Sequence, residues 1–282
     1  MIVISFVNMK GGVGKTTLSV NVADFLVKRH SKKVLFIDMD PQFNATQCLI
    51  KGSDYMEYIQ EGGTTVVDIF RKPNIANVSV VGGISQNPSC SYSNIKPYTI
   101  DRAFDLIPGQ LNLFRLEMSP GEGTEFRLKN YLKYLETNSN YDICIIDCPP
   151  TPSVWMTSAL IASDYYLIPS KPDPISMTGL DLLEGIIKER KDNYGCRCKC
   201  IGLVLTMVET NTTIFNETVK YFSNSEKWKK YLYKSYLLKR TAVAREQLNG
   251  KFISDIEESE LNLRFSGIVQ ELLRRLEGKN DE

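Results

Sequence analysis

The sequence predicts an α/β protein built as one doubly wound domain, residues 1–282, with helices on both faces of a single, mostly parallel sheet. Three observations predict this fold. Apolar, strand-like runs alternate with segments of helical spacing, which is typical of a parallel sheet covered by helices. A glycine-rich loop joins the first apolar run to the first helical segment. Apolar residues make up 43% of the chain, which is enough for a sizeable core.

The expected elements follow one another in a regular order. Ile2–Val7 is a near-continuous apolar run and is expected to form a buried strand. Thr16–Arg29 follows with apolar residues at helical spacing, and Val34–Ile37 is expected to be the second strand. The later strands and helices are expected, in chain order, at Phe104–Ile107, Glu125–Glu136, Ile143–Ile146, Trp155–Ala162, Tyr165–Ile168, Met177–Lys191, Ile201–Leu205, Thr213–Phe222 and Glu257–Leu276.

One stretch interrupts this alternation. Residues from about 74 to 101, Asn74–Asp101, are rich in Ser, Asn, Pro and Gly and have little helical period. Such composition is typical of irregular surface segments. We therefore expect a long surface excursion there and no boundary between domains.

Composition limits the classes of function. The chain carries 34 Lys and Arg against 33 Asp and Glu, a net charge of +1, so a nucleic-acid-binding surface would have to be a local basic patch. No stretch approaches the roughly 20 apolar residues of a membrane span. The N-terminal apolar run lacks a preceding positive segment and is expected to be a strand, not a signal peptide. Seven Cys, an odd number, favour reduced thiols and a cytoplasmic setting.

The loop between the first strand and the first helix carries the clearest functional signal. Glycine lets backbone N–H groups turn toward phosphate oxygens, and the helix N-terminus adds partial positive charge. Lys15 is expected against the β- and γ-phosphates of ATP, and the Thr16 hydroxyl on Mg²⁺. Met9 stands where the standard P-loop has glycine, and Lys10 is a second lysine, so the motif is a deviant Walker A. Its expected nucleotide-binding residues are Lys10, Gly11, Gly12, Val13, Gly14, Lys15, Thr16 and Thr17.

Three carboxylates follow expected strands. Asp38 and Asp40 come after the second strand, and Asp147 ends an apolar strand in the manner of a Walker B motif. The carboxyl ends of parallel strands are where open α/β sheets bind ligands. These carboxylates are therefore expected to position water or to hold Mg²⁺ and its hydration shell. An Asp that caps the following helix is the alternative for the first two.

Together these segments resemble the ParA/MinD superfamily of deviant Walker A ATPases, and the ParA/Soj partition branch in particular. The similarity runs from Ile2 to about Leu276. The loop Lys10–Thr17 matches the family's deviant Walker A, and Asp147-Cys148-Pro149-Pro150 matches its Walker B. Asp38-Met39-Asp40-Pro41-Gln42 resembles the branch's second motif. Leu205-Thr206-Met207 resembles the strand that leads to the base-binding loop, so the resemblance places Pro149 and Met207 beside the nucleotide.

The resemblance implies a mechanism. Two subunits would enclose two ATP molecules as a homodimer, and Lys10 would reach the partner's nucleotide in the manner of an arginine finger. Asp40 would position the attacking water, while Asp38 and Asp147 would lie near Mg²⁺. Similar proteins bind nucleoid DNA non-specifically as ATP dimers, without a membrane. A ParB-like or McdB-like adaptor on the cargo then stimulates hydrolysis. The cargo would be a plasmid, a chromosome origin or a protein body such as a carboxysome.

A basic run in the last third of the chain fits duplex DNA. Its aromatic neighbours, Trp228, Tyr231 and Tyr233, are also compatible with a solvated face that turns its aromatic residues into the core. The resemblance favours contacts to DNA phosphates instead. The candidate DNA-binding residues are Lys220, Lys227, Lys229, Lys230, Lys234, Arg240 and Arg245.

The cysteines, the last helix and the P-loop itself also allow other interpretations. Cys196, Cys198 and Cys200 alternate before a strand, which favours buried thiols over the usual zinc-ligand spacings. The apolar stripe of the last helix suits core packing, although a MinD-like membrane-associated regulator would carry such a helix on a membrane surface. A metabolic P-loop enzyme that activates a small carboxylate is the third alternative. The partition branch implies a cytoplasmic, nucleoid-associated protein.

Overall fold

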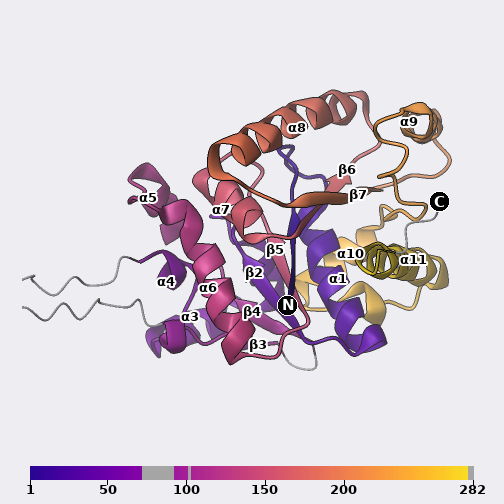
Figure 1. The fold of residues 1–282 in the computed structure, drawn as a ribbon. Coiled ribbons are helices and arrows are strands. Elements are labelled where there is room, and N and C mark those ends of the chain that lie inside the picture. Colours follow the sequence, from indigo (N-terminus) through magenta and orange to yellow (C-terminus); the bar gives the residue numbers. More distant parts are fainter. Residues whose placement is uncertain (72–91, 101–102, 279–282) are drawn as a thin grey trace, which may run out of the picture.

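A computed structural model describes residues 1–71, 92–100 and 103–278, and in these ranges seven strands form one sheet. The strand order is β3-β4-β2-β5-β1-β6-β7, and every neighbouring pair is parallel except β3 with β4 (Figure 1). The strands are β1 (Ile2–Phe6), β2 (Val34–Asp38), β3 (Tyr98–Thr99), β4 (Asp105–Ile107), β5 (Ile143–Asp147), β6 (Tyr165–Ser170) and β7 (Lys199–Leu205). The predicted fold class, a mostly parallel sheet between helices, is confirmed.

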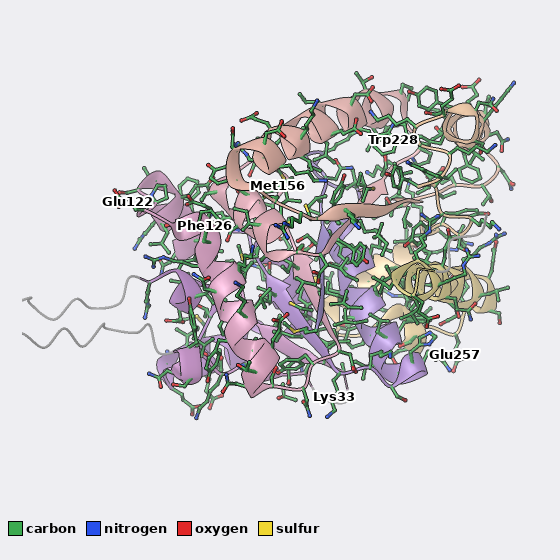
Figure 2. All side chains as sticks on the ribbon, in the orientation of Figure 1. Lys33, Glu122, Phe126, Met156, Trp228 and Glu257 are labelled. Carbon is green, nitrogen blue, oxygen red and sulfur yellow. The ribbon has the colours of Figure 1, made fainter. Side chains whose placement is uncertain are left out.

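Alternating side chains of the strands enter two separate cores. Val3 packs into one cluster and Ile4 into the other, because successive residues of a strand point to opposite faces. The helices α4 (Val66–Phe70), α6 (Thr124–Asn138), α7 (Val154–Ala162) and α8 (Pro174–Tyr194) contribute to the first cluster. The helices α1 (Lys15–His30) and α11 (Ser259–Leu276) contribute to the second. Met156 of α7 lies inside, whereas Lys33, Glu122 and Glu257 lie at the rim (Figure 2).

Every predicted helix and strand is present, with ends shifted by a few residues. Apart from the nine-residue α7, the helices of five to nine residues in the described ranges were not predicted from the sequence, because they cover few turns and show little helical period. They are α2 (Asn44–Leu49), α3 (Gly52–Gln60), α4, α5 (Asn112–Met118) and α10 (Thr241–Leu248). The longer α9 (Thr213–Asn224) was predicted.

The predicted surface excursion lies mostly outside the described residues. The part that is described, residues 92–100, forms a 3₁₀ turn, η1 (Tyr92–Asn94), and the edge strand β3. Ile95 and Ile100 are buried in the two cores. The end of this segment is therefore packed against the sheet rather than lying over the surface.

The apolar stripe of α11 is buried, as core packing requires. Leu261, Phe265, Ile268 and Leu272 have no exposed surface. Among the described residues, no helix is long and apolar enough to cross a membrane.

A lysine-rich segment, residues 226–235, runs alongside β7, the last strand of the sheet. Leu203 N donates to Tyr231 O (2.7 Å) and Tyr233 N donates to Leu203 O (2.9 Å), so the segment pairs with β7 like a short extra strand. Gly202 makes this approach possible, because a Cβ there would lie 2.1 Å from the Tyr233 ring. Arg275 of α11 fixes the segment from the other side: its guanidinium donates to the carbonyls of residues 230, 231 and 232 and to Glu271.

We expect Gly202→Ala to lower the free energy of unfolding by about 1–3 kcal/mol, because the Tyr233 ring must move. The matched control is Gly185→Ala in the middle of α8, where a Cβ meets nothing within 4 Å. That change should raise stability by about 0.5–1 kcal/mol. Urea unfolding of both variants measures the difference. Equal stabilities would contradict the close packing of this segment on β7.

Candidate nucleotide site and basic groove

The glycine loop, residues 9–14, lies between β1 and α1 in a conformation that its glycines permit. Gly12 and Gly14 have φ of 67° and 74°, in the left-handed region that other residues rarely adopt. Gly14 is also closely approached: a Cβ there would lie 3.0 Å from Met207 Cε. The loop ends where α1 begins at Lys15, which is 7% exposed. Its backbone N–H groups and the helix N-terminus form an arrangement that binds anions.

Neighbouring strand ends hold the loop in place. The Asn8 side chain donates to Pro169 O in β6 (2.6 Å), and its Oδ1 accepts from Lys10 N (2.9 Å). The Thr206 hydroxyl, after β7, donates to Val13 O (2.5 Å). The loop shape is thus fixed by contacts from β1, β6 and β7 before any ligand arrives.

Two buried carboxylates face this loop from adjacent strands. Asp38 and Asp147 are register partners at the ends of β2 and β5, and neither is exposed to solvent. The Thr16 hydroxyl donates to Asp147 Oδ2 (2.6 Å). Asp147 Oδ1 is buried without a hydrogen-bond partner among the described residues. The Thr16 hydroxyl, the Asp38 carboxylate and the unpaired Oδ1 of Asp147 are oxygen donors of the kind that Mg²⁺ prefers.

Burial dominates the electrostatics of these carboxylates. It raises the pKa of Asp38 to about 7, helped by the negative charge of Asp147 and opposed by hydrogen bonds from Thr46. Burial also raises the pKa of Asp147 to about 6, against the opposing effect of Lys15. The pKa of Asp40 is raised by burial as well, and Lys15 again opposes this. A cation placed among these groups would restore their ionised forms.

Asp38 is oriented by residues that sequence reasoning did not assign to the site. Thr46 donates to Asp38 Oδ2 through both its N–H and its hydroxyl, each at 2.8 Å. Gly109 N donates to the Thr46 hydroxyl (2.7 Å). A Cβ on Gly109 would lie 2.9 Å from Asp38 Cγ, so the loop after β4 needs glycine there. This contact joins residues 71 positions apart, which no local pattern reveals.

Lys10 is held within its own subunit. Its ammonium contacts both carboxylate oxygens of Asp173 at 2.8 Å and lies 3.2 Å from the Ser176 hydroxyl. Asp173 caps α8 by accepting from Ser176 N (2.8 Å). The two charged side chains are 34% and 27% exposed. Partly exposed ion pairs of this kind contribute little, about 0–1 kcal/mol, so Lys10 can leave Asp173 at small cost.

The other predicted nucleotide contacts lie around the start of α1. Met207 touches Gly14, as described above, while Pro149 is buried two residues after Asp147. The Thr17 hydroxyl donates to Gln247 Oε1 of α10 (3.2 Å). Gln247 was not predicted as a site residue, since α10 itself was not predicted.

The predicted DNA-binding residues separate into two groups. Lys227, Lys229, Lys230 and Lys234 line one groove with a volume of about 1330 Å³. The other three do not line it: Lys220 is exposed on α9, Arg240 contacts Glu258 and Glu260, and Arg245 contacts Glu246. Trp228 and Tyr233 are buried beside these lysines, so the aromatic residues turn inward while the lysines face solvent.

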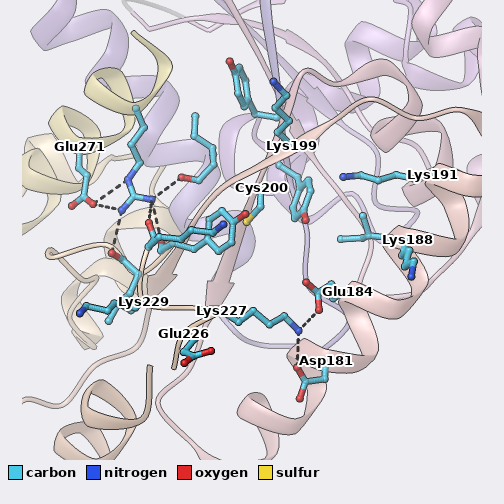
Figure 3. Close-up of a pocket in the computed structure, with 18 of the residues that line it drawn as sticks. Asp181, Glu184, Lys188, Lys191, Lys199, Cys200, Glu226, Lys227, Lys229 and Glu271 are labelled. Atoms are coloured by element: carbon cyan, nitrogen blue, oxygen red, sulfur yellow. Dashed lines mark hydrogen bonds and ion pairs between the residues drawn. The ribbon is translucent and has the colours of Figure 1, made fainter. Parts of the chain in front are cut away.

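Figure 3 shows this basic groove, which is lined by residues at the amino ends of β6 and β7. The glycine loop follows the carboxyl end of β1, which is parallel to β6, so it lies at the opposite edge of the sheet. The walls of the groove are residues 226–235, the C-terminal half of α8 and the end of α11. Lys227 bridges to Asp181 and Glu184 of α8. Nine basic side chains outnumber four acidic ones along the groove. The basic residues that sequence reasoning missed there are Lys188, Lys191, Lys199, Arg274 and Arg275.

Of the cysteines predicted to be buried thiols, Cys200 lines the basic groove, whereas Cys196 and Cys198 do not. Cys196 and Cys198 are buried, and Cys200 is half-buried at the start of β7. No group of three or more His, Cys, Asp or Glu side chains placed to hold a metal ion occurs in residues 1–71, 92–100 and 103–278.

Fold and site together define a P-loop nucleotide-binding protein, and comparison with known proteins gives the family. A sequence profile described as an AAA domain matches residues 1–198. The sporulation initiation inhibitor protein Soj of Bacillus subtilis is 30% identical over 257 residues, 88% of each chain. The chromosome partitioning protein ParA of Myxococcus xanthus is 30% identical over 219 residues, 77% of this chain and 69% of its own. The chain belongs to the ParA/Soj family of partition ATPases.

Solved structures of similar fold cover nearly the whole chain. A plasmid partition protein from Borrelia burgdorferi, bound to AMPPNP, has a TM-score of 0.71 at 24% identity and covers 97% of this chain and 98% of its own. Nucleotide-free McdA from Cyanothece has a TM-score of 0.75 at 21% identity, covering 97% and 99%. At these identities the likeness supports the fold, which the described sheet already defines.

We expect Asp38→Asn to stabilise the nucleotide-free protein at pH 8 by roughly 1–3 kcal/mol, since it removes a buried charge. The folded pKa of about 7 lies above the ordinary 3.8, so the free energy of unfolding of the unmodified protein falls as pH rises through this range. At pH 5 Asp38 is largely neutral, and the difference should shrink. Urea unfolding at both pH values tests this, with exposed Asp54→Asn as control. A pH-independent effect would contradict the electrostatic explanation.

Proposed function

We propose that this chain is an ATP-dependent, DNA-binding ParA-like ATPase that closes into a dimer on ATP and positions or segregates a cargo. The observation that carries the proposal is the glycine loop. Its left-handed glycines, buried Lys15 and the Thr16–Asp147 contact are arranged as a phosphate and Mg²⁺ site requires. Relatives named as partition proteins supply the biological setting.

Each loop residue has a role in this proposal. The N–H groups of Gly11–Thr17 bind phosphate oxygens, and Lys15 neutralises the β- and γ-phosphates. Thr16 and Asp147 hold Mg²⁺, with Asp38 beside it. When bound, Mg²⁺ neutralises charge on the transferring phosphoryl group. Asp40 orients the attacking water, and Pro149 and Met207 border the nucleotide.

Lys10 supplies the link between subunits. In the described structure its ammonium is neutralised by Asp173 of the same chain. In the proposed dimer it leaves Asp173 and reaches the nucleotide of the partner subunit, where it stabilises developing negative charge. The low cost of breaking a partly exposed ion pair makes this exchange feasible.

The basic groove is the proposed contact surface for duplex DNA. Its excess of lysine and arginine suits sequence-independent contacts with phosphates. The groove and the glycine loop lie at opposite edges of the sheet, so DNA and ATP can bind together. Of the candidate residues, Lys229, Lys230 and Lys234 are assigned to DNA; Lys227 is already engaged by Asp181 and Glu184.

A ParB-like or McdB-like adaptor would bind the ATP dimer, stimulate hydrolysis and couple the cycle to a plasmid, a chromosome origin or a protein body. The protein would then be cytoplasmic and associated with the nucleoid. The buried apolar stripe of α11 gives no support to a MinD-like membrane contact. The metabolic alternative rests on fold likeness alone, for example to cobyrinic acid a,c-diamide synthase at 20% identity.

The nucleotide part of the proposal is tested at the two loop lysines. Lys15→Ala should reduce ATP affinity by at least about 100-fold, because it removes the main cation on the phosphates. Lys10→Ala should retain ATP binding but lose turnover. Titration calorimetry and a phosphate-release assay separate the two effects. Undiminished ATP affinity of Lys15→Ala, or full turnover of Lys10→Ala, would refute the corresponding role.

The DNA part is tested with a random-sequence duplex at two salt concentrations, with ATP, with ADP and without nucleotide. Binding should require ATP and weaken steeply with salt. The double variant Lys229→Glu and Lys230→Glu should lose at least about tenfold in affinity and show a salt slope shallower by about two. The same charge change at the exposed Lys51 and Lys133, outside the groove, is the control. Equal losses in both double variants would argue against the groove, and no DNA binding in any state would favour the alternatives.

A further inference from the structure

A third lysine reaches the glycine loop from outside the motif. Lys171 lies just after β6, the strand that pairs with β1, so the segments following the two strands lie side by side. A Cβ built on Gly12 would lie 4.0 Å from Lys171 Nζ. The Lys171 ammonium therefore lies beside Gly12, in the first half of the loop.

The surroundings of Lys171 differ from those of Lys10. The Lys10 ammonium is neutralised by Asp173, whereas the Lys171 ammonium has no ion-pair or hydrogen-bond partner within the described parts of the chain. Its backbone is nevertheless fixed. Lys171 O accepts from Asp173 N (2.9 Å), and the preceding Ser170 O accepts from Thr206 N (2.8 Å). A cation on a fixed backbone, without a carboxylate partner and beside an anion-binding loop, is placed to receive an anion.

We propose that Lys171 is a further phosphate-binding residue that contacts the terminal phosphate of the ATP held by its own subunit. Gly12 precedes Lys15 in the loop, and the N-terminus of α1 cradles the inner phosphates. The position near Gly12 therefore favours the outer end of the phosphate chain. The buried Asp38, Asp40 and Asp147 lie at or just after the carboxyl ends of β2 and β5, and a further cation would offset their repulsion of the phosphate.

The consequence is selectivity for ATP over ADP. A contact to the terminal phosphate adds affinity for the triphosphate alone, because ADP has no group at that position. Lys171 would thus let the loop distinguish the two nucleotides before a dimer forms, whereas Lys10 acts only once a partner is present. The inference rests on the proposed placement of ATP in the glycine loop.

The test is equilibrium binding of fluorescent ATPγS and fluorescent ADP, each with Mg²⁺, to the full chain. Lys171→Ala should weaken ATPγS binding about tenfold and change ADP binding less than about twofold. Lys171→Arg should restore ATPγS affinity to within about threefold. Lys33→Ala, an exposed lysine before β2, is the control. The loss should persist in a Lys10→Ala background, since the contact is made within one subunit.

Two outcomes would overturn the role proposed for Lys171, and only the second would also overturn the placement of ATP in the glycine loop. If Lys15→Ala weakens both nucleotides while Lys171→Ala affects neither, or affects both equally, ATP lies in the loop but Lys171 does not contact its terminal phosphate. If Lys15→Ala also leaves both affinities unchanged, the placement of ATP itself is wrong. Thermal unfolding should show Lys171→Ala folded as stably as the unmodified chain, because the lost ammonium has no partner among the described residues.

Discussion

The structure depends first on a glycine loop placed beside two buried carboxylates, one of which, Asp147, accepts from the Thr16 hydroxyl at the start of α1. The loop can turn toward a ligand only because Gly12 and Gly14 accept left-handed φ. The parallel register of β2 and β5 then brings Asp38 and Asp147 together beneath it. Burial raises the pKa of both carboxyl groups, and the charge of Asp147 raises that of Asp38 further, so a cation bound between them would favour their ionised forms. In the proposed function a Mg²⁺-bound polyphosphate would supply this cation, and the site lowers the stability of the protein without one.

The second feature is the separation of two charged regions across one sheet. α8 connects them: its capping residue Asp173 holds Lys10 beside the loop, and its C-terminal half lines the basic groove. The groove depends on close packing, since Gly202 and Arg275 fix the lysine-rich segment between β7 and α11. A chain of net charge +1 thereby presents a strongly basic surface in one place and a carboxylate-rich site in another.

Much of this could be predicted from the sequence, and the limits are physical. The long helices and buried strands were predicted because their apolar period extends over several turns or a whole strand. The glycine loop, Asp38 and Asp147 were predicted as site residues because each lies within a short sequence motif. The close approaches of Asp38 to Gly109 and of Lys171 to Gly12 bring distant segments together and carry no local signal. The basic run was predicted from the sequence. Which of its lysines line the same groove depends on how residues 226–235 pair with β7, and the sequence does not show that pairing. The roles proposed for these residues remain predictions.

The central claim is that the nucleotide binds at the carboxyl edge of the sheet and DNA at the amino edge. Hydrogen–deuterium exchange of the full chain, with ATPγS and Mg²⁺ and then with added duplex, measures both at once. The account predicts that nucleotide slows exchange in residues 9–18 and 38–48, and that duplex further slows exchange in residues 186–201 and 226–235. Two results would contradict these binding sites. Nucleotide could slow exchange in residues 226–235 while leaving the glycine loop unprotected, or duplex DNA alone could slow exchange in the glycine loop.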